Sequence, residues 1–267
     1  MRQPQLLAWS ALSLSALLLA GCATKPTPDQ TIGWSPNRIY TEAKEEARSA
    51  NFDRAVELYE RLEGRAAGTP LAQQAELEKA HTQYRGGDKA GAVATLDRFV
   101  KLHPSSPAVD YALYLKGLVN FNDDLGLFAF MSRQDLSERD QRAAKESFES
   151  FKELVTRFPE SRYTPDAQAR MRYIINALAQ YEVHVAQYYY SRGAYIAAVN
   201  RAQAALTEYP DAPSLESALY ILVKSYDALE MPQLRDDAKR VLAQTYPNST
   251  ILQGGIKRDS GPWWKVW

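Results

Sequence analysis

A Ser-Pro or Thr-Pro dipeptide recurs along this chain at intervals typical of helical repeats. The copies are Ser35-Pro36, Thr69-Pro70, Ser106-Pro107 and Thr164-Pro165, and Ala212-Pro213 follows as a weaker fifth copy. Ser and Thr are favoured N-cap residues, and proline is pre-organised for the first helical position, so each dipeptide predicts the start of a helix. Successive prolines are 34, 37, 58 and 48 residues apart. The first two intervals are close to the 34-residue period of tetratricopeptide (TPR) repeats, each of which is a pair of helices.

Small residues repeat with a similar period inside the predicted first helix of each pair. Ala43, Ala80 and Gly117 are 37 residues apart, and Ala186 and Ser225 occupy the comparable place later in the chain. A small side chain at this point lets two helices cross closely. Seven residues after three of these positions, the chain is expected to turn into the second helix, at Ala50, Gly87 and Gly193.

The predicted second helices share both an apolar face and an ending. Apolar residues recur with helical spacing in 52–62 and 195–206, and no useful strand-like alternation occurs. Four of these helices stop at an aromatic residue or His followed by Pro, in "RFVKLHP", "ELVTRFP", "QAALTEYP" and "VLAQTYP". We therefore expect an all-α fold, an α-solenoid of about five TPR-like helix pairs over residues 36–248, in which each pair buries one face against its neighbour.

Two segments break the period. Residues 166–192 contain neither Gly nor Pro and keep apolar residues at helical spacing. This predicts one helix of about 40 Å that joins the two halves of the array. Residues 122–138 are an insertion in the third repeat. We expect a loop folded onto the core, and an apolar contact for a partner is the alternative.

The N-terminus has the features of a secretion signal. Arg2 is the only charged residue before Lys25, and the apolar run after it is shorter than the roughly 20 residues that span a bilayer. Leu19-Ala20-Gly21-Cys22 resembles the bacterial lipobox, in which the chain is cut before the Cys and the Cys is acylated, for example with palmitate. Residues 1–21 are thus the expected signal peptide.

The only cysteine of the chain, Cys22, is then the expected lipid attachment site. Several acyl chains anchor a protein stably, where one chain is marginal. By the same resemblance, Ala23 directly after the Cys favours the outer membrane over the inner membrane. Residues 22–35, with polar, Pro and Thr residues, are expected to be a flexible tether.

The sequence offers little for catalysis or metal binding. None of the three histidines has a metal-ligand spacing, and His103 takes the place that an aromatic residue fills in other repeats. No nucleophile elbow, phosphate loop or zinc-protease motif occurs. With 32 basic and 32 acidic residues, the chain has no basic field for nucleic acid. We expect a scaffold that is not an enzyme and has no cofactor beyond the lipid on Cys22.

Four stretches resemble the BamD (ComL) family, the TPR lipoproteins of the outer-membrane β-barrel assembly machinery. They are "YEVHVAQYYYSRGAYIAAVNRAQ" (181–203), "HPSSPAVDYALYLKGL" (103–118), "RFPESRYTPDA" (157–167) and "LVKSYDALEM" (222–231). With the lipobox and the five repeats, the resemblance covers nearly all of the mature chain. One departure is "EGRAAGTP" in the first repeat, where Ala66 and Ala67 stand in place of an aromatic-Pro ending.

The resemblance implies a lipoprotein that faces the periplasm of a Gram-negative bacterium. Its implied partners are the periplasmic domains of BamA, the lipoproteins BamC and BamE where these exist, and unfolded outer-membrane β-barrel proteins. Repeat periodicity alone also allows a TPR lipoprotein that acts as a pilotin or chaperone for a secretin, or as a scaffold for peptidoglycan enzymes.

Arg201 is the candidate partner-binding residue. It lies off the apolar face of its predicted helix, in line with Ala197 and Glu208, and it matches the "NR" of the family block. We expect it to project outward, with at most a weak attraction to Glu208. An arginine can bind a carboxylate with two parallel hydrogen bonds, so Arg201 is expected to pair with an acidic residue of BamA.

The C-terminal segment 249–267 is rich in tryptophan. Trp263, Trp264 and Trp267 lie beyond the last predicted helix. A disordered end is one interpretation. Because each tryptophan can bury about 150 Å² or more, the other is a segment that docks on a neighbouring surface.

Overall fold

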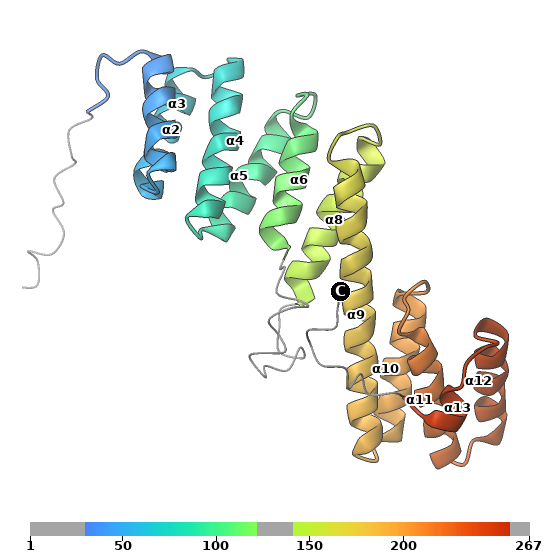
Figure 1. Cartoon of the computed structure of the whole chain (residues 1–267). Coiled ribbons are helices and arrows are strands. Elements are labelled where there is room, and N and C mark those ends of the chain that lie inside the picture. The colour runs from blue at the N-terminus through green and yellow to red at the C-terminus, as the bar shows by residue number, and fades with distance from the viewer. Residues whose placement is uncertain (1–29, 122–140, 257–267) are drawn as a thin grey trace, which may run out of the picture.

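The computed structural model of the chain describes residues 30–121 and 141–256, and these residues form helices joined by short turns (Figure 1). The helices are α2 (Pro36–Arg48), α3 (Phe52–Arg65), α4 (Pro70–Arg85), α5 (Lys89–Leu102), α6 (Val109–Asn120), α8 (Gln141–Arg157), α9 (Thr164–Ser191), α10 (Tyr195–Glu208), α11 (Leu215–Ala228), α12 (Pro232–Thr245) and α13 (Ile251–Gly254). No strand occurs in the two described ranges. The all-α prediction is confirmed.

The helices pair in chain order into a solenoid. The pairs are α2/α3, α4/α5, α6/α8, α9/α10 and α11/α12, and each helix packs mainly on its neighbours in sequence. Successive helices run in opposite directions, so the turns between pairs lie on one edge of the array and the turns within pairs lie on the other (Figure 1). The predicted five helix pairs are present, stacked as in TPR arrays.

Two of the predicted helix starts carry the expected cap. The Ser35 and Thr69 hydroxyls each accept a hydrogen bond of 3.3 Å from a backbone N–H in the first turn of α2 and α4. Pro107 and Pro213, by contrast, do not begin helices, because α6 and α11 begin two residues later. At both places a backbone hydrogen bond closes a turn just before the helix, from Val109 to Ser106 (3.2 Å) and from Leu215 to Ala212 (3.3 Å).

The turns within four of the helix pairs share one backbone conformation. Ala50, Gly87, Gly193 and Glu230 all have left-handed backbone, with φ of 62°, 87°, 75° and 57°. At each, the following residue donates a backbone hydrogen bond to the carbonyl five residues back, as in Asp88 to Gln83 at 2.9 Å. This is the Schellman motif, which favours glycine at the left-handed position. The predicted turn at the first three positions is confirmed.

The recurring small residues are buried, as their spacing predicts. Ala43, Ala80, Ala186 and Ser225 are fully buried, and Gly117 is buried as well. A Cβ atom on Gly117 would lie only 2.4 Å from the ring of Phe151 on α8. The absence of a side chain here is what allows α6 and α8 to pack.

The aromatic-Pro endings also have one shared geometry. His103, Phe158, Tyr209 and Tyr246 each donate a backbone hydrogen bond of 2.8–3.1 Å to the carbonyl four residues back, at the end of the second helix of their pair. The His103 ring packs on Phe99 with centroids 5.2 Å apart, which is the aromatic role predicted for it. In the first repeat, Ala66 makes the same backbone bond, to Leu62 at 2.9 Å.

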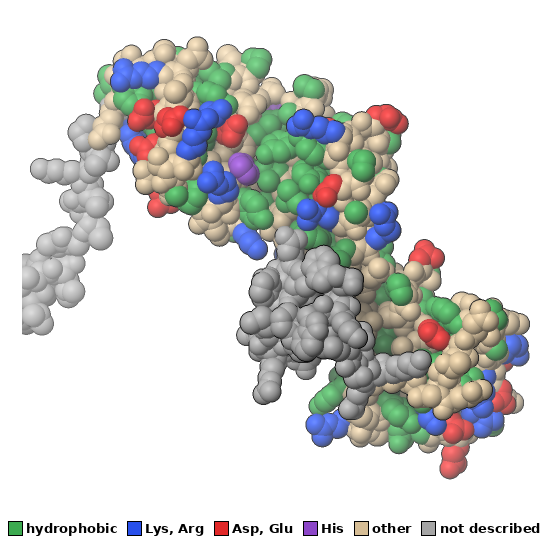
Figure 2. Space-filling view, in the orientation of Figure 1, with side chains coloured by type: hydrophobic (Ala, Val, Ile, Leu, Met, Phe, Trp, Pro, Cys, Tyr) green, Lys and Arg blue, Asp and Glu red, His purple; other side chains and the backbone are tan. Residues whose placement is uncertain are grey.

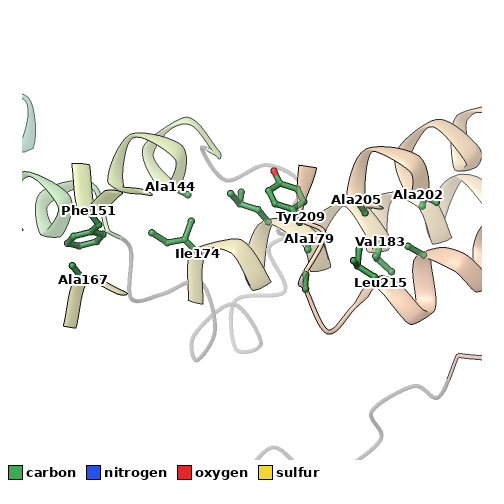
Figure 3. Close-up of a cluster of buried hydrophobic side chains, with 14 of the residues drawn as sticks. Ala144, Phe151, Ala167, Ile174, Ala179, Val183, Ala202, Ala205, Tyr209 and Leu215 are labelled. Atoms are coloured by element: carbon green, nitrogen blue, oxygen red, sulfur yellow. The ribbon is translucent and has the colours of Figure 1, made fainter. Parts of the chain in front are cut away.

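The core consists of two apolar clusters that meet at α4. One joins α2, α3 and the start of α4 around Leu58, Tyr59 and Leu62. The other runs from α4 to α13. Figure 3 shows part of it, with Phe151 and Ala167 at one end and Val183, Ala202 and Leu215 toward the other. Helix α9 contributes to this cluster along its whole length.

Helix α9 spans 28 residues without interruption, which confirms the predicted long helix. Its first half packs on α8 and its second half on α10 (Figure 1). At 1.5 Å per residue it is about 42 Å long. Among the residues described, no helix is both long enough and apolar enough to cross a membrane.

The ends of the solenoid differ from the expected boundaries. Thr31, expected in the tether 22–35, is fully buried, so the packed structure begins before Pro36. The Arg65 side chain at the end of α3 donates to the Thr31 carbonyl (2.6 Å) and hydroxyl (2.9 Å), which explains the burial. At the other end, α13 lies within the expected tail 249–267 and packs on α11 through the buried Ile251.

Candidate partner-binding surface

Helix α9 carries a glutamate at a position that faces the core. Glu182 is 7% exposed, and buried Ala179, Val183 and Ala186 surround it in sequence on the same helix. A glutamate is rarely buried unless it is paired with a cation. Its partner is expected on the helix packed against this face, which is α10.

Arg201 on α10 is that partner. Its Nη1 lies 3.2 Å from Glu182 Oε2 and 3.5 Å from Oε1, and its side chain is 45% exposed. The hydrogen bond to Glu182 raises the pKa of the Arg201 guanidinium. The guanidinium has five N–H donors, so the pairing through Nη1 leaves Nε and Nη2 available to a second carboxylate.

This geometry corrects part of the expectation for Arg201. The side chain does reach the surface, but its nearest acid is Glu182 on the preceding helix rather than Glu208 on its own. The Glu208 carboxylate lies 4.0 Å from the ammonium of Lys145 on α8. Glu182 is 19 residues before Arg201 in the chain and on another helix, so charges spaced along α10 alone do not reveal the pair.

A second pair of this kind lies in the second repeat. Glu76 on α4 is 5% exposed and accepts a hydrogen bond of 2.7 Å from Nε of Arg98 on α5, whose side chain is 47% exposed. Arg98 also reaches Glu63 on α3, at 2.8 Å, and Glu63 in turn pairs with the buried Lys79 at 2.9 Å. Glu76 is thus part of a network within the array, whereas Glu182 forms an ion pair with Arg201 alone among the residues that the structure describes.

The two glutamates occupy the same place in their repeats. Each lies four residues before the buried small residue of its first helix, Ala80 for Glu76 and Ala186 for Glu182. In the other three repeats, this place holds a buried apolar residue, at most 2% exposed: Ile39, Leu113 and Ile221. A glutamate at a core position is therefore the sequence signal that could have revealed both pairs.

A second surface feature is a hollow of about 560 Å³ bordered by α4, the start of α6 and the α8–α9 turn. Its walls include Tyr111 and Tyr163, whose rings are 5.7 Å apart, and the carboxylates Glu78 and Asp110. Burial, with the nearby Glu78 charge, raises the pKa of Tyr111 to about 12. Figure 2 shows hydrophobic side chains gathered over the α4–α6 region, between the more charged ends of the array.

Several sequence expectations lie outside the described residues, among them the signal peptide 1–21 and the part of the tether up to residue 29. The others are the acylation of Cys22, the insertion 122–138 and the docking of the three tryptophans in 257–267. Within 30–121 and 141–256, no group of three or more His, Cys, Asp or Glu side chains is placed to hold a metal ion.

A family model described as YfiO, outer membrane lipoprotein, matches residues 34–250, which run from the turn before α2 to the residue before α13. The chain belongs to the YfiO/BamD family. The family resemblance of the sequence, including the 181–203 block that carries Glu182 and Arg201, is thereby confirmed.

Relatives in this family extend over nearly the full chain. The outer membrane protein assembly factor BamD of Neisseria meningitidis serogroup B is 44% identical over 94% of this chain and 96% of its own length. BamD of Xylella fastidiosa is 32% identical over 92% of this chain and 84% of its own. BamD of Vibrio cholerae is 32% identical over 86% of this chain and 94% of its own.

Similarity to solved structures is weaker. The chain resembles the MamA protein over 85% of its length and 98% of that chain, with 13% identity and a TM-score of 0.37. It resembles TPR-like repeats of a kinesin light chain from Podosopora anserina, with 15% identity and a TM-score of 0.38, over 80% of this chain and 99% of that one. Similarity at this level carries no argument about the function of a YfiO/BamD protein.

Proposed function

We propose that this protein is an outer-membrane lipoprotein that serves as a non-catalytic scaffold of the β-barrel assembly machinery. The observation that carries the proposal is its membership of the YfiO/BamD family over residues 34–250, together with relatives named outer membrane protein assembly factors. In this proposal the protein binds the periplasmic domains of BamA, the lipoproteins BamC and BamE, and unfolded outer-membrane proteins.

Arg201 is the proposed contact to BamA. The half-exposed guanidinium is held from behind by the buried carboxylate of Glu182, so its position is set before a partner arrives. Holding a side chain in its bound geometry lowers the entropic cost of binding. An acidic side chain of BamA that meets the Nε and Nη2 donors would make the paired hydrogen bonds that arginine favours.

The hollow between α4, α6 and the α8–α9 turn is the proposed contact for unfolded clients. Tyr111 and Tyr163 give it aromatic walls that can pack on apolar side chains, and its rim is polar, with Glu78, Asp110 and Arg162. Client segments destined for β-barrels alternate apolar and polar residues. Such segments match a site with an aromatic wall and a charged rim.

A pull-down from solubilised membranes with the lipidated, full-length protein tests the proposal. We expect recovery of a β-barrel protein with periplasmic repeats, together with small lipoproteins. Recovery of a secretin or of a peptidoglycan hydrolase in its place would contradict the proposal and support the alternative lipoprotein roles.

The Arg201 contact has a matched control in Arg98. Both arginines are about half exposed and pair with a buried glutamate, at 45% and 47% side-chain exposure. We expect Arg201→Ala to weaken BamA binding, Arg201→Lys to restore part of it, and Arg98→Ala to leave it intact. Equal losses in Arg201→Ala and Arg98→Ala would show that the effect is structural and that Arg201 is no contact.

The lipid anchor is tested separately by Cys22→Ser. Because the described fold begins at residue 30, we expect the variant to fold and to leave the membrane fraction. A Cys22→Ser protein that still pellets with outer membranes lacking its partners would contradict the anchor.

A further inference from the structure

The chain enters the solenoid through a tight turn at residues 31–34, here called the N-terminal turn. The Trp34 N–H donates to the Thr31 carbonyl at 3.0 Å, which closes the turn. Gly33, at the third position, has φ of +80°. A positive φ at that position is what a type II turn requires, and glycine adopts it without steric cost.

One side of the N-terminal turn is fixed to the array. Arg65, the last residue of α3, donates to the carbonyl and hydroxyl of the fully buried Thr31, at 2.6 and 2.9 Å. It also reaches the Trp34 carbonyl at 3.4 Å. The turn is therefore a rigid part of the first repeat, joined to a residue 34 positions further along the chain.

The other side of the N-terminal turn presents apolar surface to solvent. Ile32 is 76% exposed, more than any other large hydrophobic side chain that the structure describes as exposed. Turn tips are normally occupied by Gly, Pro, Asn, Asp or Ser. Trp34 follows, half-buried against the first core cluster, with the Arg38 guanidinium 4.3 Å from its ring centroid.

This set of side chains is typical of protein surfaces that lie in a membrane interface. An aliphatic residue enters the acyl boundary, tryptophan prefers the headgroup level, and arginine interacts with lipid phosphates. Ile32 is ten residues after Cys22, so at full extension the two are no more than about 35 Å apart. A lipid on Cys22 would keep the turn close to the bilayer at all times.

We propose that the N-terminal turn rests on the surface of the lipid bilayer, with the Ile32 side chain inserted at the acyl boundary. The proposal rests on the lipid anchor at Cys22. Because Arg65 fixes the turn to α3, this contact sets the tilt of the first repeat relative to the membrane. The anchor alone would leave that orientation free.

Site-specific labelling tests the contact directly. The chain has a single cysteine, whose thiol is blocked by acylation in the lipidated protein, so an introduced cysteine is the only one that reacts. Ile32→Cys is labelled with an environment-sensitive maleimide dye and reconstituted into phosphatidylethanolamine–phosphatidylglycerol vesicles. Ile196→Cys is the matched control, because Ile196 on α10 is also an exposed isoleucine, at 65%.

We expect the dye at position 32 to shift its emission to the blue on vesicles and to become several-fold less accessible to aqueous iodide. The dye at position 196 should show neither change. Full iodide quenching of the dye at both positions would overturn the proposal. Protection of the dye from iodide to the same extent at both positions would overturn it too. Protection of position 32 that appears only when a protein partner is added would also overturn it, because the turn would then be a protein contact.

Flotation of the same vesicles separates this proposal from the anchor on which it rests. If the labelled protein does not float with the vesicles, the protein is not anchored by a lipid, and the proposal that rests on this anchor fails with it. If the protein floats and the dye at position 32 stays exposed, the anchor stands and the N-terminal turn does not touch the membrane. Neither result bears on BamA binding, since no other protein is present.

Discussion

The carboxylate of Glu182 on α9 and the guanidinium of Arg201 on α10 lie 3.2 Å apart, with the glutamate buried and the arginine half exposed. An arginine that was only solvated could be replaced at little cost in stability. Removal of Arg201 instead leaves an unpaired carboxylate in a core position. The pair therefore links a half-exposed arginine to the packing of two helices.

Arg201→Ala should lower the free energy of unfolding by about 1–2 kcal/mol. A hydrogen bond to a charged group contributes in this range, and the exposure of the arginine keeps the loss below that of a fully buried pair. In the Arg201→Ala background, Glu182→Leu should restore stability, because three other repeats hold Ile or Leu at this place. Urea unfolding followed by circular dichroism measures both. An Arg201→Ala protein as stable as wild type would show that Glu182 needs no partner.

Gly117→Ala should destabilise the third repeat by about 1–3 kcal/mol, the range typical of overpacking. The added methyl group would lie 2.4 Å from the Phe151 ring, so α6 and α8 would have to separate. Gly64→Ala on α3 is the control, because a Cβ there meets nothing within 4 Å. That change should stabilise α3 slightly through helix propensity. Similar effects from the two substitutions would contradict the close packing at Gly117.

Glu230→Gly and Ala50→Gly should each raise the melting temperature. Both residues have left-handed backbone, with φ of 57° at Glu230 and 62° at Ala50, a conformation that costs an L-residue about 1–2 kcal/mol. Glycine relieves the strain and loses part of the gain through its greater freedom in the unfolded chain, so we expect about 0.5–1 kcal/mol from each. The reverse change, Gly193→Ala, should destabilise. Thermal unfolding that moves in the same direction for all three would count against the strain.

Asp166 should make stability depend on pH below about pH 4. Partial burial acts to raise its pKa, but hydrogen bonds from Arg170 (2.6 Å) and Tyr114 (2.8 Å) outweigh this and lower it. A carboxyl whose pKa is lower in the folded state stabilises the fold above its unfolded pKa and loses this effect as pH falls through the folded pKa.

Asp166→Asn therefore should be less stable than wild type at pH 7, and the difference should shrink toward pH 2. Melting temperatures of both proteins across this pH range give the comparison, and subtraction removes the contribution of other carboxyls common to both. A difference that stays constant with pH would show that the loss comes from packing.

Most of the fold could be predicted because the repeat leaves several independent marks in the sequence. The buried small residues, the left-handed turns and the aromatic helix ends each recur at the same place in several repeats, and each is tied to a local geometry that few residues satisfy. Pro107 and Pro213 do not begin helices as predicted, because a proline is compatible both with a first helical turn and with the turn just before it. The local sequence does not separate these two cases.

The site was less predictable than the fold. Arg201 could be chosen by family resemblance, but its partner Glu182 depends on how α9 packs on α10. Glu182 would have been found by asking which repeat positions should be apolar and are not. The burial of Thr31 had no such signal, because it depends on one hydrogen-bonding side chain, Arg65, at the far end of α3.

The unbroken helix α9 gives the array a fixed geometry between its two ends. Its first half packs on α8 and its second half on α10, so the two halves of the solenoid cannot swing apart unless a 28-residue helix bends. Neither glycine nor proline interrupts it after Pro165, and these are the usual sites of helix kinks. The two halves of the array are therefore held in one relative position by α9. If Cys22 is acylated and Arg201 contacts BamA, as proposed, the number of stacked helices sets the distance between the first repeat and that contact, and inserting one more repeat should change it.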